Sequence, residues 1–186
     1  MVDDILVIDD IIPKTYQDVI EQSLFSSHFP WYLQKDITFI EDKFDNYGFN
    51  HGLKLEDGTI NSAFFDGILP MTFLVIDRCN LEQKNLVQAR AFLQTNRGKK
   101  THNKPHVDLH YPHTVFLYYV NDSDGDTFLF EETLEDTPNP QKDYQFNLKQ
   151  SISPKKGRGV IFNGNRYHAS SNPTKIPRCV INFDLN

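Results

Sequence analysis

The chain has 186 residues, a formal net charge of −6 and 39% hydrophobic residues, including 15 Phe and 8 Tyr. A domain of this length can bury a sizeable apolar core, so folding requires neither disulfides nor a structural metal. The acidic balance excludes a general attraction for phosphate backbones, so we expect no nucleic-acid partner. The two cysteines, Cys79 and Cys179, indicate a reducing compartment rather than a disulfide framework.

The N-terminal residues carry no targeting signal that we recognise. Met1–Asp4 lacks a basic region, and no long apolar run follows it. No stretch of the sequence is apolar enough over the length needed to cross a bilayer. We therefore expect a cytoplasmic protein without a membrane partner.

The first half of the chain predicts two helices between extended and loop segments. The expected elements are a strand at 4–9, a helix from Pro13 to about Leu24, an extended segment at 37–40, a loop or hairpin at 41–62, and a helix at about 64–78. Proline suits the first turn of a helix, and the apolar residues that follow Pro13 have helical spacing. The many Gly, Asp and Asn residues between the two helices are typical of turns.

From residue 86 onward the pattern changes to short strands separated by turn residues. The expected strands are 86–95, 106–108, 114–120, 127–130, 145–148, 159–162 and 178–185. Helices followed by many short strands indicate a mainly β fold with N-terminal helices and a double-stranded β-helix (jelly-roll, cupin-like) core. We predict one domain over 1–186, with helical support in about 1–85 and the jelly-roll core in about 86–186.

A candidate metal site lies in the strand-rich part. In an extended segment, residues two apart point to the same face, so His106 and Asp108 project together. His168 follows a predicted strand and its turn, and it would approach from another strand. Two imidazoles and one carboxylate suit Fe(II) with three open positions, whereas a structural zinc site is closed by four ligands. We predict that His106, Asp108 and His168 are the catalytic metal ligands.

Other polar clusters nearby have simpler interpretations. His102, His106, His110 and His113 could form a zinc-binding ladder on a helix, but the neighbouring prolines disfavour a helix there. We expect His102, His110 and His113 at the rim or surface, where His110 and His113 could line a substrate entrance. The acidic segment Asp122–Asp126 departs from the calcium-loop pattern, and a hairpin turn between Val120 and Thr127 explains it better.

Arg178 is the candidate anchor for a co-substrate. Alternation along 178–185 places Arg178, Val180, Asn182 and Asp184 on one face and Cys179, Ile181, Phe183 and Leu185 on the other. A guanidinium buried in a barrel needs an anionic partner, and a dicarboxylate that chelates the metal at one end would provide it. We also expect one hydroxyl of Tyr118 or Tyr119 to meet that carboxylate. Arg90, Phe92 and Gln94 alternate on another strand and could face the same cavity.

These residues resemble a known family, the iron(II)/2-oxoglutarate-dependent dioxygenases, and within it the prolyl 4-hydroxylase-like group that includes small oxygenases of bacteriophages. The resemblance covers essentially the whole chain and is strongest over 86–186. The similar segments, beyond His106, Asp108, His168 and Arg178, are Val7–Pro13, Phe29–Leu33, Phe116–Asn121, Gly125–Phe130, Pro154–Phe162 and Arg178–Phe183. Two departures are Arg178, where collagen-type enzymes have Lys, and Gly125-Asp126, where many relatives have Gly-Gly. The second departure leaves the substrate open.

The resemblance implies an enzyme that hydroxylates an unactivated C–H bond and releases succinate and CO2. The implied substrate is a peptidyl proline, another amino-acid side chain or a small molecule. The implied cofactors are Fe(II), 2-oxoglutarate, O2 and, as an accessory, ascorbate. Arg178 would bind the C5 carboxylate of 2-oxoglutarate, with Tyr119 nearby. We expect a monomer or weak dimer, in the cytoplasm of a cell or of a phage-infected host.

Two further functions are compatible with the same residues. One is a jelly-roll module that keeps a metal without turnover. The other is oxidative demethylation of nucleic acid, which the acidic charge disfavours. Substrate specificity would lie in the loops 41–62, 96–104 and 131–143.

Overall fold

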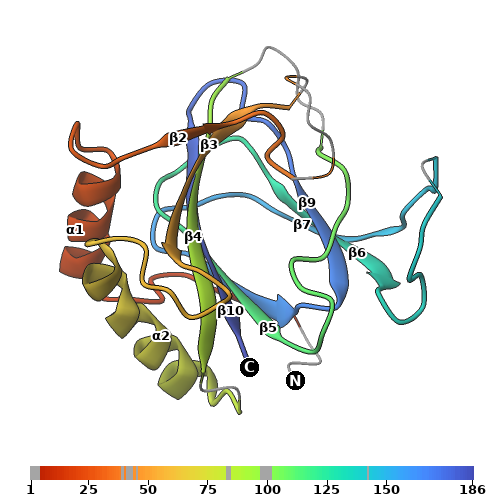
Figure 1. Cartoon of the computed structure of the whole chain (residues 1–186), viewed down its shortest axis with the longest axis horizontal. Helices are drawn as coiled ribbons and strands as arrows, with labels where there is room; N and C mark the ends of the chain where they lie inside the picture. The colour runs from red at the N-terminus through yellow and green to blue at the C-terminus, as the bar shows by residue number, and fades with distance from the viewer. Residues whose placement is uncertain are drawn as a thin grey trace.

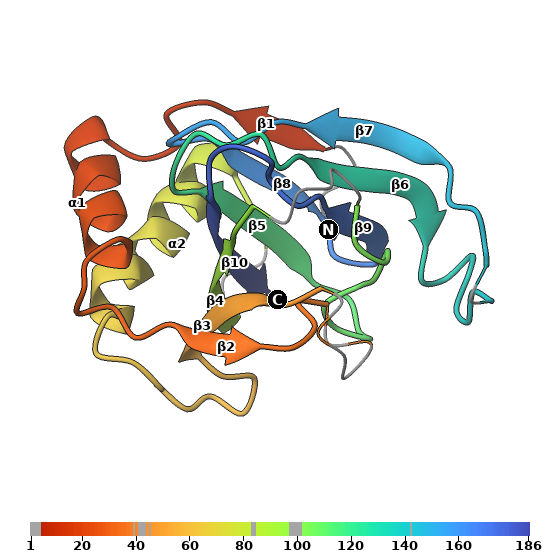
Figure 2. The ribbon, with the colours of Figure 1, turned by 90° about the horizontal axis from the view of Figure 1, so that it is seen from above.

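The computed structural model describes residues 5–38, 40, 44, 46–82, 85–96, 102–141 and 143–186. Within them two antiparallel sheets face each other, and two helices cover the outer face of the larger sheet (Figures 1 and 2). This arrangement confirms the mainly β jelly-roll with N-terminal helices that the sequence predicts.

The larger sheet has seven strands in the order β1-β8-β5-β10-β4-β3-β2, and the smaller has three in the order β7-β6-β9. The helices are α1 (Lys14–Leu24) and α2 (Phe65–Cys79). The strands are β1 (Leu6–Ile8), β2 (Tyr32–Gln34), β3 (Gly48–Lys54), β4 (Leu86–Gln94), β5 (Thr114–Tyr119), β6 (Thr127–Thr133), β7 (Leu148–Ile152), β8 (Gly159–Asn163), β9 (Arg166–Ser170) and β10 (Arg178–Leu185). The N-terminal segment thus supplies three strands as well as both helices.

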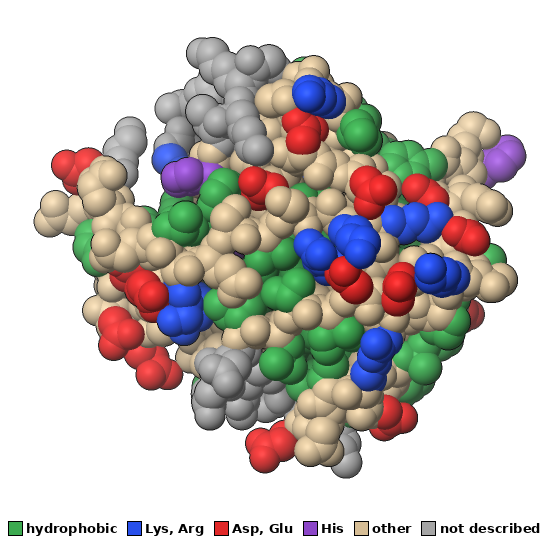
Figure 3. Space-filling model, turned by 180° about the vertical axis from the view of Figure 1, so that it is seen from behind, with side chains coloured by type: hydrophobic (Ala, Val, Ile, Leu, Met, Phe, Trp, Pro, Cys, Tyr) green, Lys and Arg blue, Asp and Glu red, His purple; other side chains and the backbone are tan. Residues whose placement is uncertain are grey.

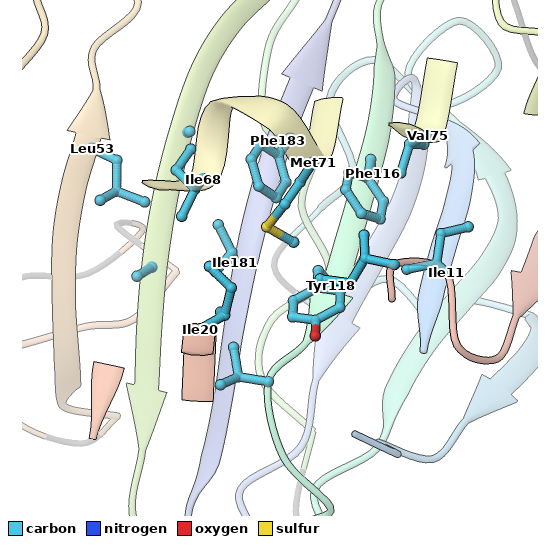
Figure 4. Close-up of a cluster of buried hydrophobic side chains, with 14 of the residues drawn as sticks. Ile11, Ile20, Leu53, Ile68, Met71, Val75, Phe116, Tyr118, Ile181 and Phe183 are labelled. Atoms are coloured by element: carbon cyan, nitrogen blue, oxygen red, sulfur yellow. The ribbon is translucent and has the colours of Figure 1, made fainter. Parts of the chain in front are cut away.

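Both helices bury one apolar face against the larger sheet. In α1, Ile20 and Leu24 lie four residues apart and are buried, and Pro13 precedes the first turn. In α2, Ile68 and Met71 lead a buried stripe at helical spacing, and the helix ends at a left-handed Asn80. Side chains of the helices meet outward residues of the central strands in one continuous core (Figure 4).

Alternation along β5 and β10 sorts their side chains into two separate cores. Phe116, Tyr118 and the odd-numbered residues of β10 pack under the helices. Leu117 and Tyr119 face the other way and pack between the sheets with Val180. Each large apolar side chain buried in this way contributes about 1.5–3 kcal/mol. The predicted alternation of 178–185 is confirmed, and it directs Arg178 and Asn182 into the space between the sheets.

Several predicted elements differ in the structure. The extended segment expected at 37–40 is a turn at Ile37 and Thr38, and Phe39 lies outside the described residues. The region 41–62 contains strand β3. The strand expected at 145–148 lies instead at β7, because the polar residues 143–147 run as an irregular segment before the pairing with β6 begins. Strand β9 is absent from the predicted list of strands, although His168 was expected to approach from another strand, as it does.

The connection between Val120 and Thr127 is not the predicted hairpin. Strand β5 belongs to the larger sheet and β6 to the smaller one, so the segment crosses between sheets. The Asp124 carboxylate accepts hydrogen bonds from the backbone amides of Thr174, Lys175 and Ile176. These bonds tie the crossing to the segment before β10 and occupy the carboxylate that a calcium site would need.

The surface carries charges of both signs. Figure 3 shows acidic and basic side chains interspersed over the face turned away from the viewer of Figure 1. Among the described residues, no helix is both long and apolar enough to span a membrane.

Candidate metal centre and adjoining pocket

A cavity of about 680 Å³ opens between the two sheets. It contains all three predicted metal ligands and the predicted carboxylate anchor Arg178. Its other lining residues come mainly from β4, β9 and β10 and from three loop segments, with one residue each from β5, β6 and β8. These include Ile37, Thr38, Ile40, Arg90, Phe92, Gln94, Pro105, Val107, His110, Leu117, Thr127, Pro138, Asn139, Pro140, Phe162, Tyr167, Ala169, Ser170, Val180 and Asn182.

His106, Asp108 and His168 are close enough to hold one ion. One potential ligand atom from each side chain lies within 4.8 Å of the others, and the two imidazole centroids are 4.6 Å apart. His168 lies on β9. His106 and Asp108 lie between β4 and β5 in a segment that is not the predicted strand, because its only ladder contact is a bridge from His106 to His168. Even so, the short bridge brings the side chains to one place.

The imidazoles are oriented for metal binding through Nε2. His106 Nδ1 lies 3.1 Å from the Lys104 carbonyl oxygen, and His168 Nδ1 lies 3.2 Å from the Arg166 carbonyl oxygen. A carbonyl can only accept, so each Nδ1 carries a proton, and in the neutral ring each Nε2 carries the lone pair that a metal would take. This arrangement is typical of metal-ligating histidines. The donor set therefore fits a divalent transition metal.

Charge and burial shift the pKa values of the three predicted ligands in different directions. Burial, together with the nearby His168, lowers the pKa of His106 to about 4. Burial also opposes the charged forms of His168 and Asp108, but their mutual attraction outweighs it. The pKa of His168 is raised, and Arg90 with His168 holds the pKa of Asp108 well below its usual range. An ionised carboxylate facing a neutral His106 is a suitable partner for a cation.

Arg178 is a buried cation whose hydrogen-bond partners among the described side chains are neutral, and Asp126 acts on it only as a nearby charge. The arginine is 4% exposed, and burial lowers the pKa of its guanidinium. Its Nη1 donates to Gln94 Oε1 and its Nη2 to Thr127 Oγ1, both at 2.8 Å, while its Nε has no hydrogen-bond partner. A buried charge whose hydrogen-bond partners are all neutral favours an anionic ligand.

Tyr119 lies behind this anchor rather than on the cavity wall. Its hydroxyl donates to Thr127 Oγ1 at 2.7 Å, and the guanidinium carbon of Arg178 lies 5.7 Å from its ring centre. Tyr118 points to the opposite face, under the helices, as one of the two was expected to do. Direct contact between Tyr119 and a co-substrate stays a prediction.

Other residues considered from the sequence have mixed outcomes. Arg90, Phe92 and Gln94 line the cavity as expected, and so does the exposed His110. His113 was expected at the rim, which is wrong: its side chain is completely buried against Gly164 and Asp184. Tyr111, whose carbonyl oxygen lies 2.8 Å from His113 Nδ1, helps to hold the ring inside.

Sequence reasoning missed two cavity residues that contact predicted site residues. Thr127 bonds Arg178, and Asn182 Nδ2 donates to Asp108 Oδ2 at 3.0 Å. The alternation of β10 placed Asn182 on the face of Arg178 and so gave a usable signal. Nothing in the sequence set Thr127 apart from the other threonines.

No family model and no curated protein matches the sequence. Solved structures do match. An oxidoreductase of the 2OG-Fe(II) oxygenase family from Burkholderia pseudomallei has a TM-score of 0.67 at 9% identity, over 98% of this chain and 84% of that one. A prolyl-4-hydroxylase from Pseudomonas putida has 0.59 at 9%, over 98% and 92%.

A third similar structure is a prolyl hydroxylase from Trichoplax adhaerens in complex with a hypoxia inducible factor peptide fragment. It has a TM-score of 0.62 at 14% identity, over 97% of this chain and 82% of that one. At these identities the likeness establishes the fold. The chain therefore has the fold of the 2OG-Fe(II) oxygenases and prolyl hydroxylases, with a His–Asp–His cluster and a buried arginine in one cavity.

Proposed function

We propose that the protein is an Fe(II)- and 2-oxoglutarate-dependent dioxygenase that hydroxylates an unactivated C–H bond. One observation carries the proposal: a cluster of three potential metal ligands and a buried arginine hydrogen-bonded only to neutral side chains among the described residues line the same cavity. A metal site alone would serve many functions, and an arginine alone would bind many anions. Together they match a co-substrate with a metal-chelating end and a carboxylate end.

His106, Asp108 and His168 would hold the iron through two nitrogens and one oxygen. The bound iron and 2-oxoglutarate would use O2 to convert substrate C–H to C–OH, with one oxygen atom going to the product, the other to succinate, and CO2 leaving. The neutral form of His106 keeps its lone pair available over the physiological pH range, because its pKa is lowered to about 4. Ascorbate would act only as an accessory reductant.

Arg178 would bind the far carboxylate of 2-oxoglutarate, and Thr127 would assist it. The Thr127 hydroxyl oxygen accepts from both Tyr119 and Arg178, so its own proton remains available to donate to a carboxylate. Charge-assisted bonds of this kind are the strongest available to a carboxylate. Tyr119 would act through Thr127.

The substrate is proposed to be a peptidyl proline or another uncharged amino-acid side chain. Apart from Asp108, Arg90 and Arg178, no cavity-lining residue among those described is an Asp, Glu, Lys or Arg. The loop residues Pro138 and Pro140 and the facing Ile37 add apolar surface. Two of the similar structures are prolyl hydroxylases, one of them with a peptide fragment, which supports a peptide substrate.

Succinate release tests the proposal. Purified protein with Fe(II), 2-oxoglutarate and O2 is screened against proline-containing peptides, free amino acids and methylated oligonucleotides, and products are identified by mass spectrometry. We expect substrate-dependent succinate with a matching gain of one oxygen atom. Asp108→Ala and Arg178→Leu should abolish or strongly reduce it, whereas His102→Ala, at an exposed histidine outside the cavity, should not.

Each negative outcome points to a specific alternative. A protein that binds Fe(II) and 2-oxoglutarate but forms no succinate, either with or without added substrate, would be a non-catalytic metal-binding module. Turnover confined to methylated oligonucleotides would identify a demethylase. Wild-type protein that binds neither reagent would refute the proposal.

A further inference from the structure

The two oxygens of Asp108 have different partners. Arg90 Nη2 donates to Oδ1 at 2.6 Å, whereas Oδ2 accepts from Asn182 and lies 3.3 Å from His168 Nε2. Oδ2 is therefore the oxygen on the side of the histidine ligands. Oδ1 is engaged by a charged donor, and such bonds are shorter and roughly twice as strong as neutral ones.

Arg90 is held in place by the register of the larger sheet. Strands β4 and β10 pair so that Arg90 lies opposite Asn182 and Gln88 lies opposite Asp184. Because residues two apart share a face, all four side chains point into the same side of the sheet. Figure 1 shows β4 and β10 side by side in the larger sheet.

A buried acid holds the guanidinium from behind. Asp184 is completely buried; its Oδ2 lies 3.6 Å from Arg90 Nη2 and accepts from Gln88 Nε2 at 2.8 Å. The ring centre of Phe92 lies 5.5 Å from the Arg90 guanidinium carbon. Arg90 thus sits between two carboxylates, with an aromatic side chain beside it. Asp184 bonds none of the three proposed ligands, and its contact with Arg90 helps to hold the guanidinium in place.

We propose that Arg90 is a positioning residue that keeps Asp108 a one-oxygen ligand. This inference rests on the proposed function, because it assumes a metal at the His–Asp–His cluster. A free carboxylate can bind a metal through both oxygens, and that would take one of the positions needed for a chelating co-substrate. By holding Oδ1, Arg90 reserves that position for 2-oxoglutarate.

The test uses Co(II) as a spectroscopic probe, with the variants Arg90→Met and Arg90→Lys. We expect the wild-type protein to bind Co(II), with binding lost in His168→Ala. In Arg90→Met, both oxygens of Asp108 should bind, so the visible Co(II) spectrum should change. The dissociation constant for 2-oxoglutarate should rise about tenfold or more, the scale on which partners of metal ligands act. Co(II) affinity should not fall in parallel. Arg90→Lys, which keeps a charged donor, should restore part of the wild-type spectrum.

Arg158→Met serves as the matched control. Arg158 also pairs with a carboxylate, Asp9, but on the surface and away from the cavity. Its loss should change neither the Co(II) spectrum nor 2-oxoglutarate binding. A crystal structure of Co(II)-loaded Arg90→Met would show directly whether one or both oxygens bind.

The outcomes separate the two proposals. An Arg90→Met protein with the wild-type spectrum and wild-type 2-oxoglutarate affinity would overturn the positioning role and leave the proposed function intact. A wild-type protein that binds no Co(II) would overturn both, and that result needs no Arg90 variant. If Arg90→Met fails to fold, Arg90→Gln, which removes the charge but keeps a polar side chain, takes its place. A changed spectrum with weaker 2-oxoglutarate binding supports the inference, and a wild-type spectrum, with or without weaker co-substrate binding, contradicts it.

Discussion

The backbones of His106 and His168 are hydrogen-bonded to each other in both directions, each amide nitrogen lying 3.0 Å from the other residue's carbonyl oxygen. The two imidazoles therefore project from adjacent, fixed points even though the residues are far apart in the sequence. Because the backbone bonds already hold the two segments together, a metal ion would find the two histidines in place. Ligand geometry then depends mainly on the third residue, Asp108.

Metal binding should stabilise the folded protein, because a preformed site binds the ion and the unfolded chain does not hold it. With metal at one hundred times its dissociation constant, the gain is about 2.7 kcal/mol. The measurement is the unfolding temperature with Fe(II) or Co(II), under anaerobic conditions for iron, before and after chelation. His168→Ala should lose the shift and His102→Ala should keep it. Equal shifts in both variants would place the ion elsewhere.

Gly125→Ala should weaken 2-oxoglutarate binding. A methyl group there would lie 2.8 Å from the Ser171 carbonyl oxygen and 3.1 Å from Arg178 Cδ, so the anchor has to move. Overpacking of this kind costs about 1–3 kcal/mol of stability. Where about 1.4 kcal/mol of that strain falls on the bound position of Arg178, the dissociation constant rises about tenfold.

Calorimetry of 2-oxoglutarate binding to the metal-loaded protein measures this effect. Gly67→Ala is the control, because a methyl group at Gly67 meets nothing within 4 Å and alanine is the better helix former. Unchanged affinity in Gly125→Ala would show that the arginine adapts without loss.

The roles of Tyr119 and Thr127 can be separated by Tyr119→Phe and Thr127→Val. Removal of the tyrosine hydroxyl should cost about 0.5–1.5 kcal/mol of stability, the value of a net hydrogen bond. It should raise the dissociation constant for 2-oxoglutarate less than Thr127→Val does, because only Thr127 lines the cavity. If Tyr119→Phe weakens binding as much or more, the tyrosine contacts the co-substrate directly, as the sequence predicts.

Asp184 should make the stability of the metal-free protein depend on pH. Burial and the charge of Asp108 raise its pKa from 3.8 to about 7. Between these values the folded state binds a proton that the unfolded state has released. The contribution of this proton to the free energy of unfolding is complete below pH 3.8, and it is lost as the pH rises toward 7. One proton gives at most about 1.4 kcal/mol per pH unit.

Asp184→Asn removes this titration and keeps the shape of the side chain. Urea unfolding of both metal-free proteins from pH 5 to pH 9 should show a steeper fall with pH up to about 7 in the wild type, and parallel curves above it. Parallel curves over the whole range would mean that Asp184 is ionised throughout. The other titrating groups are common to both proteins, so the difference between the curves reports Asp184 together with its electrostatic effect on Asp108 and His168.

Much of the site follows from local patterns in the sequence. The two-residue period of 178–185 predicted which side chains of β10 face the cavity, because a strand packed on both sides must alternate. The His106-x-Asp108 spacing and the later His168 predicted the ligand cluster. The three side chains do cluster although residues 106–108 form no strand, since the bridge between the histidines brings them together. Their role as metal ligands stays a prediction.

The remainder depends on contacts that no local pattern records. Strand β9 has the sequence Arg-Tyr-His-Ala-Ser, in which only Tyr167 and Ala169 are buried. It forms a strand because it pairs with β6 in the smaller sheet. His113 looked like a surface residue because its burial needs the bare backbone of Gly164 beside it. The segment between β5 and β6 crosses from one sheet to the other because of tertiary packing, which its turn residues alone do not specify.

The position of β10 in the larger sheet has a consequence for how the protein is made. It pairs with both β4 and β5, which do not pair with each other, and it follows them and every other described strand in the chain. Until β10 emerges during synthesis, those two strands expose unpaired edges that favour association with other chains. Its insertion would close the sheet and deliver Arg178 and Asn182 together. Substitutions that slow this single late step would therefore reduce the yield of soluble protein even where the finished fold tolerates them.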